Sequence, residues 1–269
     1  MIIMAGIALL IPVYNNQRGL LDSLAALQTE EPLDAVVVDD GSDPPIEVPD
    51  QANGHRVYRL RLDPNQGIEH ALNEGLAFIR RRGYEFVARL DAGDVALPTR
   101  FAKQKRFLLE HPDCMLVSSH VEFVDAQGRH QYLYRVPITP EQVCRKMHLK
   151  SCFLHPAVMF RASALDQIGG YRLNYPAAED YEFFFRFVRR WPAANLNCPL
   201  TRTIITPNSI SLGRRRMQIL SRLRIKLRYF DPRIHESYVG VLRDIVLLML
   251  PARFVLLWKR RWLRAQGTG

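Results

Sequence analysis

The sequence predicts an α/β fold with a doubly wound, mostly parallel sheet, followed by amphipathic basic helices. Short apolar runs alternate with segments of helical periodicity through the first third of the chain, which is the pattern of strands joined by crossover helices. Hydrophobic residues make up 48% of the 269 residues, enough for a sizeable core. This length predicts one large domain, or one domain with an appendage.

The first half of the sheet follows from apolar runs bounded by turn residues. We expect strands at residues 7–13, 35–38, 56–62 and 84–88. Leucines at helical spacing after the first strand, at positions 20, 21, 24 and 27, predict a helix there. Another helix is expected over residues 68–82, where Gly75 permits close packing on the sheet and Gly83 ends the helix. Pro98 is expected in the first turn of a third helix.

The second half of the chain is less regular. We expect a strand at residues 115–124 with a turn at 125–128, and a further apolar run at 153–160. Gly169 and Gly170 interrupt the pattern. The helix expected at residues 178–191 is rich in aromatic residues, which we interpret as core packing.

Three of the expected strands end in polar loops, Tyr14–Asn15, Asp39–Asp40 and Asp91–Asp94. Ligands bind at the carboxyl edge of open α/β sheets, so these loops predict one pocket. A ring beside carboxylates suits a base, a ribose and a diphosphate, and the carboxylates of Asp91 and Asp94 suit a divalent cation or sugar hydroxyls. A capping turn before a helix is the other interpretation of Asp94. The chain lacks GxGxxG and GxxxxGK[ST], which argues against dinucleotide oxidoreductases and phosphate-loop NTPases.

An ordered set of motifs between residues 6 and 211 resembles the inverting family 2 glycosyltransferases of GT-A fold. The motifs are IPVYN at 11–15, VVDDGS at 37–42, NQG at 65–67 with ALNEG at 71–75, LDAGD at 90–94 with Leu97, Pro98 and Arg100, HPAVMFR at 155–161, IGGY at 168–171, EDYE at 179–182 and NSIS at 208–211. The resemblance implies a Rossmann-like catalytic domain over residues 1–211. Its nucleotide-sugar half would cover about 1–100, its acceptor half about 101–211, and a helical tail would occupy 212–269.

The resemblance also implies an activity and residue roles. A hexosyl or deoxyhexosyl group would pass from a nucleotide-diphosphate sugar to a glycan or lipid-linked acceptor in cell-surface polysaccharide synthesis. Asp180, beside Glu179, matches the general base that takes the acceptor's proton; an acidic helix N-terminus is the other interpretation of this pair. Tyr14 would stack on the base and Asp40 would accept its N3–H. The remaining nucleotide-sugar contacts implied are Pro12, Asn15, Asn65, Gly67, Asp91 and His155.

Two positions of the implied site, His155 and Gly93, have two interpretations each. His155 would donate to the leaving diphosphate, or it is a turn residue before proline. Gly93 lies where the family's Asp-x-Asp motif usually has its second carboxylate. Either Asp94 joins Asp91 in binding Mn²⁺ or Mg²⁺, or Arg and His donors carry more of the leaving-group charge. The His that often precedes the Ser-Ile-Ser element is absent as well.

Basic residues concentrate at the C-terminal end. From Arg202 onward, fifteen Lys and Arg stand against three Asp and Glu, a formal +12, which leaves −2 of the total +10 for the rest of the chain. Residues 214–230 place an apolar stripe beside this charge, made of Met217, Leu220, Leu223, Leu227 and Phe230, and residues 245–258 follow. We expect an interfacial helix pair on an anionic membrane. A packed helix with a solvated basic face is the alternative.

The compartment expected is the cytoplasm, with peripheral attachment to the inner face of the cell membrane. The four cysteines form no CxxC pair and predict reduced, mostly buried thiols. The apolar N-terminus lacks the basic residues of a signal peptide, and no run is long enough to span a bilayer. No nucleic-acid motif is present, so nucleic acid is not an expected partner.

Two other functions share this fold. A non-catalytic nucleotide-sugar-binding protein is the alternative, because Gly93 weakens the metal motif. A nucleotidyltransferase would need a Gly-rich basic loop after the first strand, and residues 14–19 contain only Arg18.

Overall fold

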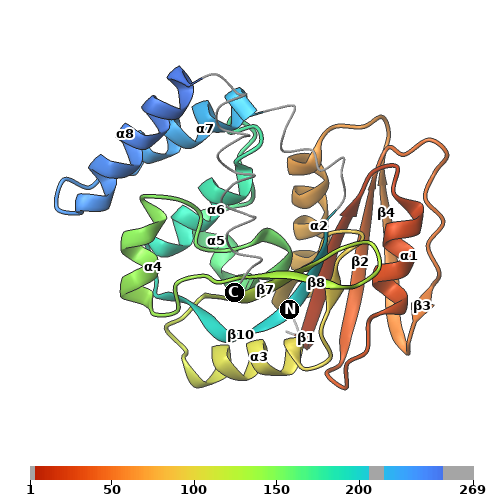
Figure 1. Cartoon of the computed structure of the whole chain (residues 1–269). Helices are drawn as coiled ribbons and strands as arrows, with labels where there is room; N and C mark the ends of the chain where they lie inside the picture. The colour runs from red at the N-terminus through yellow and green to blue at the C-terminus, as the bar shows by residue number, and fades with distance from the viewer. Residues whose placement is uncertain (1–3, 206–214, 251–269) are drawn as a thin grey trace.

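The computed structural model describes residues 4–205 and 215–250 (Figure 1). In chain order the elements are β1 (Met4–Val13), α1 (Gln17–Ala25), β2 (Leu33–Asp40), β3 (Gln51–Ala52), β4 (His55–Leu62), α2 (Ile68–Arg82), β5 (Tyr84–Arg89), β6 (Val95–Ala96), α3 (Arg100–Glu110), β7 (Leu116–Val124), β8 (His130–Tyr134), α4 (Pro140–Met147), η1 (His155–Ala157), β9 (Met159–Arg161), η2 (Ala162–Ala164), α5 (Leu165–Ile168), α6 (Glu179–Val188), β10 (Ala193–Ile204), α7 (Arg215–Arg228) and α8 (His235–Met249).

The sheet has the order β3-β4-β2-β1-β5-β9-β7-β10-β6, with β8 beside β7. Strands β4, β2, β1 and β5 run parallel, and β7 is parallel to β10, while β9 joins the two parts antiparallel to β5 and β7. The expected mainly parallel α/β sheet is confirmed. Because β4, β2, β1 and β5 share a direction, the loops that follow them meet at one edge of the sheet.

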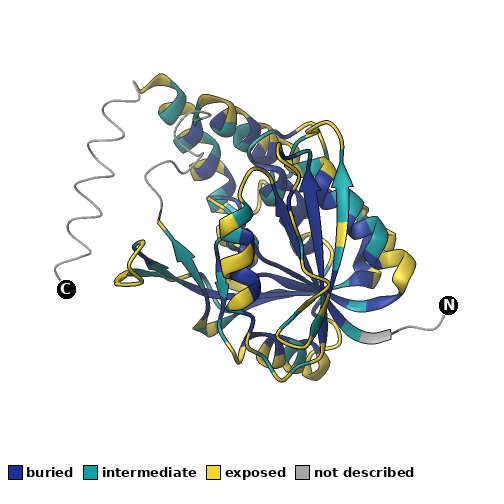
Figure 2. Cartoon of the chain, turned by 90° about the vertical axis from the view of Figure 1, so that its right-hand side faces the viewer, coloured by how far each residue is buried: buried dark blue, intermediate teal, exposed yellow. Residues whose placement is uncertain are grey.

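Both faces of the sheet are covered, which explains the continuous apolar runs. Ile7, Leu9 and Ile11 of β1 pack on the side that contains residues of α1 and α3. Ala8 and Leu10 face the opposite side, with residues of α2 and α6. Figure 2 shows the central strands in the dark blue of buried residues, between these helical layers.

Helix α2 lies against β1 and β2 as the sequence predicts. Its buried face consists of Ala71, Leu72, Gly75, Leu76 and Ile79, and the helix ends at Gly83, whose φ of 76° is left-handed. A Cβ added at Gly75 would lie 2.2 Å from Leu10 Cδ1 and 3.1 Å from Val38 Cγ2. A side chain at position 75 would therefore force Leu10 to shift, because the helix backbone approaches the sheet closely.

Several local expectations differ from the structure. Helix α3 begins at Arg100 after Thr99, so Pro98 precedes the first turn instead of lying in it. Leu27 is buried but lies beyond the end of α1. The run at 153–160 forms only the short strand β9, because its first part adopts the turn η1. Two of the four free cysteines, Cys114 and Cys152, are buried, so the thiols are less buried than expected.

The aromatic residues of α6 are core residues, as expected. Phe183, Phe184, Phe185 and Phe187 are all buried, and their neighbours include Tyr171 and Phe160. Their packing fixes the helix that begins at Glu179 and Asp180. The position of these two carboxyl groups therefore depends on the aromatic core behind them.

Helices α7 and α8 pack against each other, and α7 also packs against α6. Lys226 of α7 forms an ion pair with Asp244 of α8 at 2.6 Å, and both side chains are buried. Tyr229, just after α7, stacks on Phe185 with ring centroids 4.9 Å apart and donates to Glu182 Oε1 at 2.6 Å. The pair lies at the end of the molecule away from β3 and β4 (Figure 1). Within the described ranges, no helix is long and apolar enough to cross a bilayer.

Candidate active site

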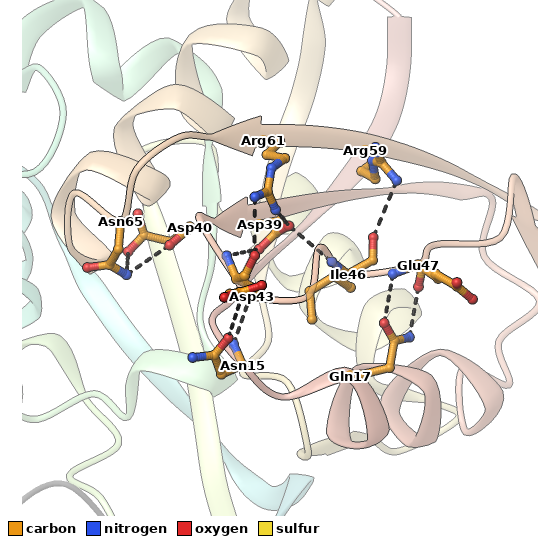
Figure 3. A network of polar contacts seen from close by, with 11 residues as sticks. Asn15, Gln17, Asp39, Asp40, Asp43, Ile46, Glu47, Arg59, Arg61 and Asn65 are labelled. Atoms are coloured by element: carbon orange, nitrogen blue, oxygen red, sulfur yellow. Dashed lines mark hydrogen bonds and ion pairs between the residues drawn. The ribbon is translucent and has the colours of Figure 1, made fainter.

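The loop after β1 is tied to the loop after β2. Asn15 has a left-handed φ of 48°; its backbone N–H donates to Ser42 Oγ at 2.9 Å, and its Oδ1 accepts from the Asp43 N–H at 3.0 Å (Figure 3). These bonds leave the preceding Tyr14 ring 52% exposed at the carboxyl edge. Pro12 is buried within β1, opposite Val38.

Asp39 and Asp40, adjacent at the end of β2, have separate structural partners. Asp39 is fully buried and accepts from the backbone N–H groups of Ser42 and Ile46 and from Arg61. Burial alone would raise the pKa of Asp39, but these hydrogen bonds outweigh it and lower the pKa below its ordinary value. Asp39 therefore stays ionised and braces the loop that follows β2.

Asp40 holds the loop that precedes α2. Its Oδ1 accepts from the Gln66 N–H at 2.9 Å, and its Oδ2 accepts from the Gly67 N–H at 3.0 Å and from Asn65 Nδ2 at 2.9 Å. Figure 3 shows the Asn65 side chain turned onto this carboxylate. The structure thus brings Asp40, Asn65 and Gly67 together. A contact between Asp40 and a base stays a prediction.

The loop after β5 presents one carboxylate and buries another. Asp91 is 46% exposed and its Oδ1 accepts from Arg89 Nη2 at 2.6 Å. Asp94 is buried, and its Oδ2 accepts from Thr203 of β10 at 3.0 Å. Burial and the nearby charge of Asp91 raise the pKa of Asp94 to about 7. The two carboxyl groups proposed from the sequence as metal ligands therefore have different environments.

The N-terminus of α6 supplies two more carboxyl groups. Burial and the neighbouring Asp180 raise the pKa of Glu179 to about 8. The pKa of Asp180 is raised to about 6, mainly by burial and also by the charge of Asp91. The hydrogen bond from the Tyr181 N–H and the charge of Arg89 act in the opposite direction. Asp180 and Asp91 are therefore close enough to influence each other, although 89 residues separate them in the chain.

Glu182, one turn further along α6, is unavailable for chemistry. It is fully buried and accepts from Arg186, from Arg172 and from Tyr229. Arg186 in turn donates to the carbonyl groups of residues 168–170. This network anchors α6 to the Gly169–Gly170 loop.

His155 lies next to Tyr171, with Nε2 2.8 Å from the tyrosine hydroxyl oxygen. Burial and the charge of Arg89 lower the pKa of His155 well below its ordinary value, so the ring is neutral at neutral pH. Tyr171 is itself fixed by Asn73, which accepts from its N–H at 2.7 Å and donates to its carbonyl oxygen at 2.9 Å. The Asn of the ALNEG motif therefore positions the IGGY motif.

The family model described as glycosyl transferase family 2 matches residues 8–169, more than half of the chain. The chain belongs to glycosyl transferase family 2. The matched region contains the loops after β1, β2 and β5 and includes His155. The resemblance inferred from the ordered motifs is confirmed.

Two relatives of this family 2 chain are named as sugar transferases. The amylovoran biosynthesis glycosyltransferase AmsE of Erwinia amylovora is 33% identical over 136 residues, which cover 50% of this chain and 49% of AmsE. The UDP-Gal:alpha-D-GlcNAc-diphosphoundecaprenol beta-1,3-galactosyltransferase of Escherichia coli is 30% identical over 126 residues, covering 46% and 44% respectively. The chain thus spans about half the length of the curated relatives it matches.

The fold also matches a solved structure. The mannosyltransferase PcManGT of Pyrobaculum calidifontis, in complex with GDP-Man and Mn²⁺, superposes with a TM-score of 0.58 and 17% identity. The match covers 93% of this chain and 71% of the mannosyltransferase. At this identity the comparison establishes the GT-A fold alone.

The family 2 site fits a divalent cation through one carboxylate. The Asp91 side chain is 46% exposed, and within the described residues its one side-chain partner is Arg89, on Oδ1, so its other oxygen could hold a metal. Mg²⁺ commonly takes one or two carboxylates and completes its shell with substrate phosphates and water. Residues 4–205 and 215–250 contain no group of three His, Cys, Asp or Glu side chains that could hold a metal ion by themselves. A metal held by Asp91 would complete its shell with other oxygen ligands, such as the diphosphate and water.

Two buried arginines at this site, Arg89 and Arg100, were not predicted from the sequence to have a role. Arg89 was part of the stretch singled out in the sequence, but its charge was assigned no role. Arg100, fully buried, donates to the carbonyl groups of Arg89 and Val158. Arg89 ends an otherwise apolar strand, and this was the signal available in the sequence. A charge that is buried there requires a partner, so it indicates a polar site nearby.

A hollow of about 560 Å³ lies elsewhere, at the amino ends of β1, β2, β4 and β5, lined in part by Asp34, His55 and Tyr84. It is at the opposite edge of the sheet from the loops described above. It therefore belongs to neither the expected nucleotide contacts nor the carboxylate cluster.

Proposed function

We propose that this chain is an inverting glycosyltransferase that moves a hexosyl or deoxyhexosyl group from a nucleotide-diphosphate sugar to a glycan or lipid-linked acceptor in cell-surface polysaccharide synthesis. The observation that carries the proposal is the convergence of Asp91 and Asp180 beside Arg89, at the edge where the loops after β1 and β2 also end. The polysaccharide and diphosphoundecaprenol named for its relatives support the acceptor class.

Asp180 is the proton acceptor in this proposal. With pKa values of about 6 for Asp180 and about 8 for Glu179, the first is ionised near pH 7 and the second holds its proton. The acceptor hydroxyl oxygen attacks the anomeric carbon, its proton passes to Asp180, and the bond to the diphosphate oxygen breaks with the electron pair leaving on the diphosphate. Glu179 assists by remaining neutral beside the base.

The donor would occupy the edge formed by the loops after β1, β2 and β4. The exposed Tyr14 ring would stack on the base, while Asn15, Asn65 and Gly67 would line the ribose and diphosphate. A divalent cation, Mn²⁺ or Mg²⁺, held by Asp91 would supply the positive charge that stabilises the departing diphosphate. Asp94 would support this loop from its buried bond to Thr203. His155, as a neutral ring, would donate one N–H toward the leaving group.

Asp180→Asn tests the proposal, with Glu179→Gln as the matched control on the same helix turn. We expect Asp180→Asn to bind the nucleoside diphosphate normally and to lose at least about two decades of turnover, since only the base is removed. Glu179→Gln should retain most turnover because Glu179 is already neutral. Near-normal transfer by Asp180→Asn would contradict the assignment. Donor binding without transfer or hydrolysis by the unaltered protein would favour the non-catalytic alternative.

The tail region, residues 212–269, would hold the enzyme on the inner face of the membrane. The outward face of α8 contains Tyr238, Leu242, Ile245, Val246 and Met249, of which Leu242 is 63% and Met249 78% exposed. At 100° per residue these side chains lie on one side of the helix. Each large side chain buried in a bilayer would contribute about 1.5–3 kcal/mol.

The exposed face of α7 adds positive charge to this apolar surface. Met217, Leu220 and Leu227 are exposed there, together with Arg216, Arg224 and Arg228. Of the five residues of the apolar stripe predicted from the sequence, these three are exposed, while Leu223 and Phe230 are half-buried. Helix α7 is also packed on α6. Each arginine near an anionic surface would contribute about 1 kcal/mol, weakened by salt. Residues 251–269, expected to continue this tail, lie outside the described residues, as does the Ser-Ile-Ser element.

Sedimentation with vesicles tests the membrane proposal without truncating a packed tail. Leu242→Glu combined with Met249→Glu should reduce binding to vesicles containing phosphatidylglycerol by at least about tenfold, since two exposed apolar contacts are replaced by repelled charges. Leu109→Glu, which alters a leucine of α3 that is 53% exposed, is the control. Equal binding by both proteins would refute attachment through this face.

A further inference from the structure

A cluster of charged side chains joins the strands β7, β8 and β10, with Glu122 of β7 at its centre. Glu122 Oε2 accepts from Arg202 Nε at 3.0 Å, and Arg202 Nη2 lies at the same distance from this oxygen. Glu122 Oε1 lies 3.0 Å from His130 Nδ1. The side chains of Glu122, His130 and Arg202 are 21%, 56% and 39% exposed, so solvent reaches all three. The nucleotide contacts and the base proposed above include none of these residues.

The cluster lies on the face of the sheet that α6 covers. Glu122 and Leu116 are an even number of positions apart on β7, so their side chains share one face, and Leu116 belongs to the apolar cluster that contains residues of α6. The pairing with β10 agrees. Glu122 lies opposite Arg202, and Arg202 lies opposite Val95 of β6. The next residue, Ala96, packs on the other face, with residues of α1 and α3.

The loop that contains Asp91 and Asp94 leads directly into this pairing. Asp94 precedes β6, and its N–H donates to the Asp91 carbonyl oxygen at 3.0 Å, which closes a tight turn. The ends of such a turn lie less than about 7 Å apart. Arg202 is the antiparallel partner of Val95, and the Cα atoms of such partners are about 4.5–5.5 Å apart. The cluster is therefore next to the candidate active site, and the sheet order places it across β5 from the strands of the expected nucleotide contacts.

The charged groups of the cluster keep hydrogen-bonding capacity. Arg202 directs Nε and Nη2 to Glu122, and a guanidinium has further N–H groups on Nη1. A carboxylate accepts at about four positions, which the contacts from Arg202 and His130 do not fill. The hydrogen bonds from His130 and Arg202 lower the pKa of Glu122 below its ordinary value, so the carboxylate is ionised at neutral pH.

We propose that Glu122 and Arg202 bind neighbouring hydroxyl groups of the acceptor sugar, while His130 holds the carboxylate in place. A sugar hydroxyl both donates and accepts hydrogen bonds. A carboxylate beside a guanidinium therefore matches two adjacent hydroxyls, because Glu122 accepts from one and Arg202 donates to the other. The inference rests on the proposed function, since it takes a glycan as the acceptor. It adds the place where that acceptor binds.

Asp125 offers a matched control in the same hairpin. Its Oδ2 accepts from Arg129 Nε at 2.7 Å, and its Oδ1 accepts from the backbone N–H groups of Gln127 and Arg129. The Asp125 side chain is 22% exposed, close to the value for Glu122. It lies in the turn between β7 and β8. A carboxylate that only stabilises the hairpin should affect Tm when it is neutralised, without any effect on sugar binding.

The experiment uses the full-length protein saturated with UDP or GDP, whichever binds more tightly. The acceptor probes are the methyl glycosides of glucose, galactose, mannose and N-acetylglucosamine. Saturation-transfer NMR measures their binding, and thermal denaturation checks the fold of each variant. Glu122→Gln should weaken glycoside binding by at least about tenfold, since a hydrogen bond to a charged group is lost, and should leave the nucleotide Kd unchanged. Arg202→Lys keeps the charge but loses the planar fork, so binding should weaken several-fold. Asp125→Asn should bind the glycosides as the unaltered protein does.

Three results would overturn the inference: unchanged glycoside binding by folded Glu122→Gln, an equal loss in Asp125→Asn, or no glycoside binding by the unaltered protein. If Glu122→Gln does not fold, Arg202→Lys decides, because undiminished binding by that variant would overturn the inference as well.

Transfer assays with UDP- and GDP-sugars separate this inference from the proposed function. Glycoside binding that depends on Glu122, without any sugar transfer, refutes the proposed enzyme and supports the sugar site. Transfer with an acceptor KM that Glu122→Gln does not change refutes only the sugar site.

Discussion

Replacing Asp40 by alanine should loosen the loop between β4 and α2 and, through it, weaken nucleotide binding. The carboxylate accepts three hydrogen bonds, from Asn65 Nδ2 and from the backbone N–H groups of Gln66 and Gly67, at 2.9–3.0 Å. Bonds to a charged group contribute about 1.5–3 kcal/mol each. Because residues 63–66 are exposed, water can replace part of this set, and we expect a net loss of about 1.5–3 kcal/mol.

Thermal denaturation and calorimetric titration with nucleoside diphosphate measure the two consequences. For a chain of this size the expected loss lowers Tm by about 3–10 °C, and binding should weaken in the same variant. Asp43→Ala is the matched control, because it removes an exposed carboxylate of the neighbouring loop and the same charge. If Asp40→Ala melts with the control while nucleotide binding disappears, the carboxylate contacts the nucleotide and does not hold the loop, which would refute this prediction.

Four further predictions concern packing, pH, metal and base stacking. Gly75→Ala should destabilise the fold by about 1–3 kcal/mol, because its Cβ would meet Leu10; an unchanged denaturation midpoint would contradict this close approach. Turnover should fall as pH drops through about 6, because protonation removes the ionised base Asp180, and a rate independent of pH between 5 and 7 would exclude that assignment. Excess chelator should abolish transfer, and added Mn²⁺ should restore it. Full activity in chelator would show that the site with Gly93 works without a metal. Tyr14→Ala should weaken nucleoside diphosphate binding by about 1–3 kcal/mol, the usual contribution of a base stacked on an aromatic ring, and an unchanged Kd would rule out stacking there.

The first half of the fold is encoded locally. The apolar runs at 7–13 and 35–38 are continuous because both faces of β1 and β2 are buried, and a run of that kind is visible without tertiary information. Helix α2 was predicted with its bounds because a turn precedes it and Gly83 ends it. The second half was predicted less well, and β10 shows why. This strand contains polar residues and Pro199, and its register with β7 shifts around Pro199, so its sequence has no simple periodicity.

The sequence also determined which kinds of residue gather at the carboxyl edge, because strand direction and loop position follow from the alternation of elements. Only the tertiary structure decided how they differ. Asp94 is buried under a bond to Thr203, 109 residues later in the chain, while Asp91 stays exposed. The charge of Arg89 acts on Glu179 and Asp180, about ninety residues away in the chain. Spacing along a chain encodes periodicity and direction, but burial and electrostatic partners arise from long-range packing, so the charge state of each carboxyl group is decided by the fold.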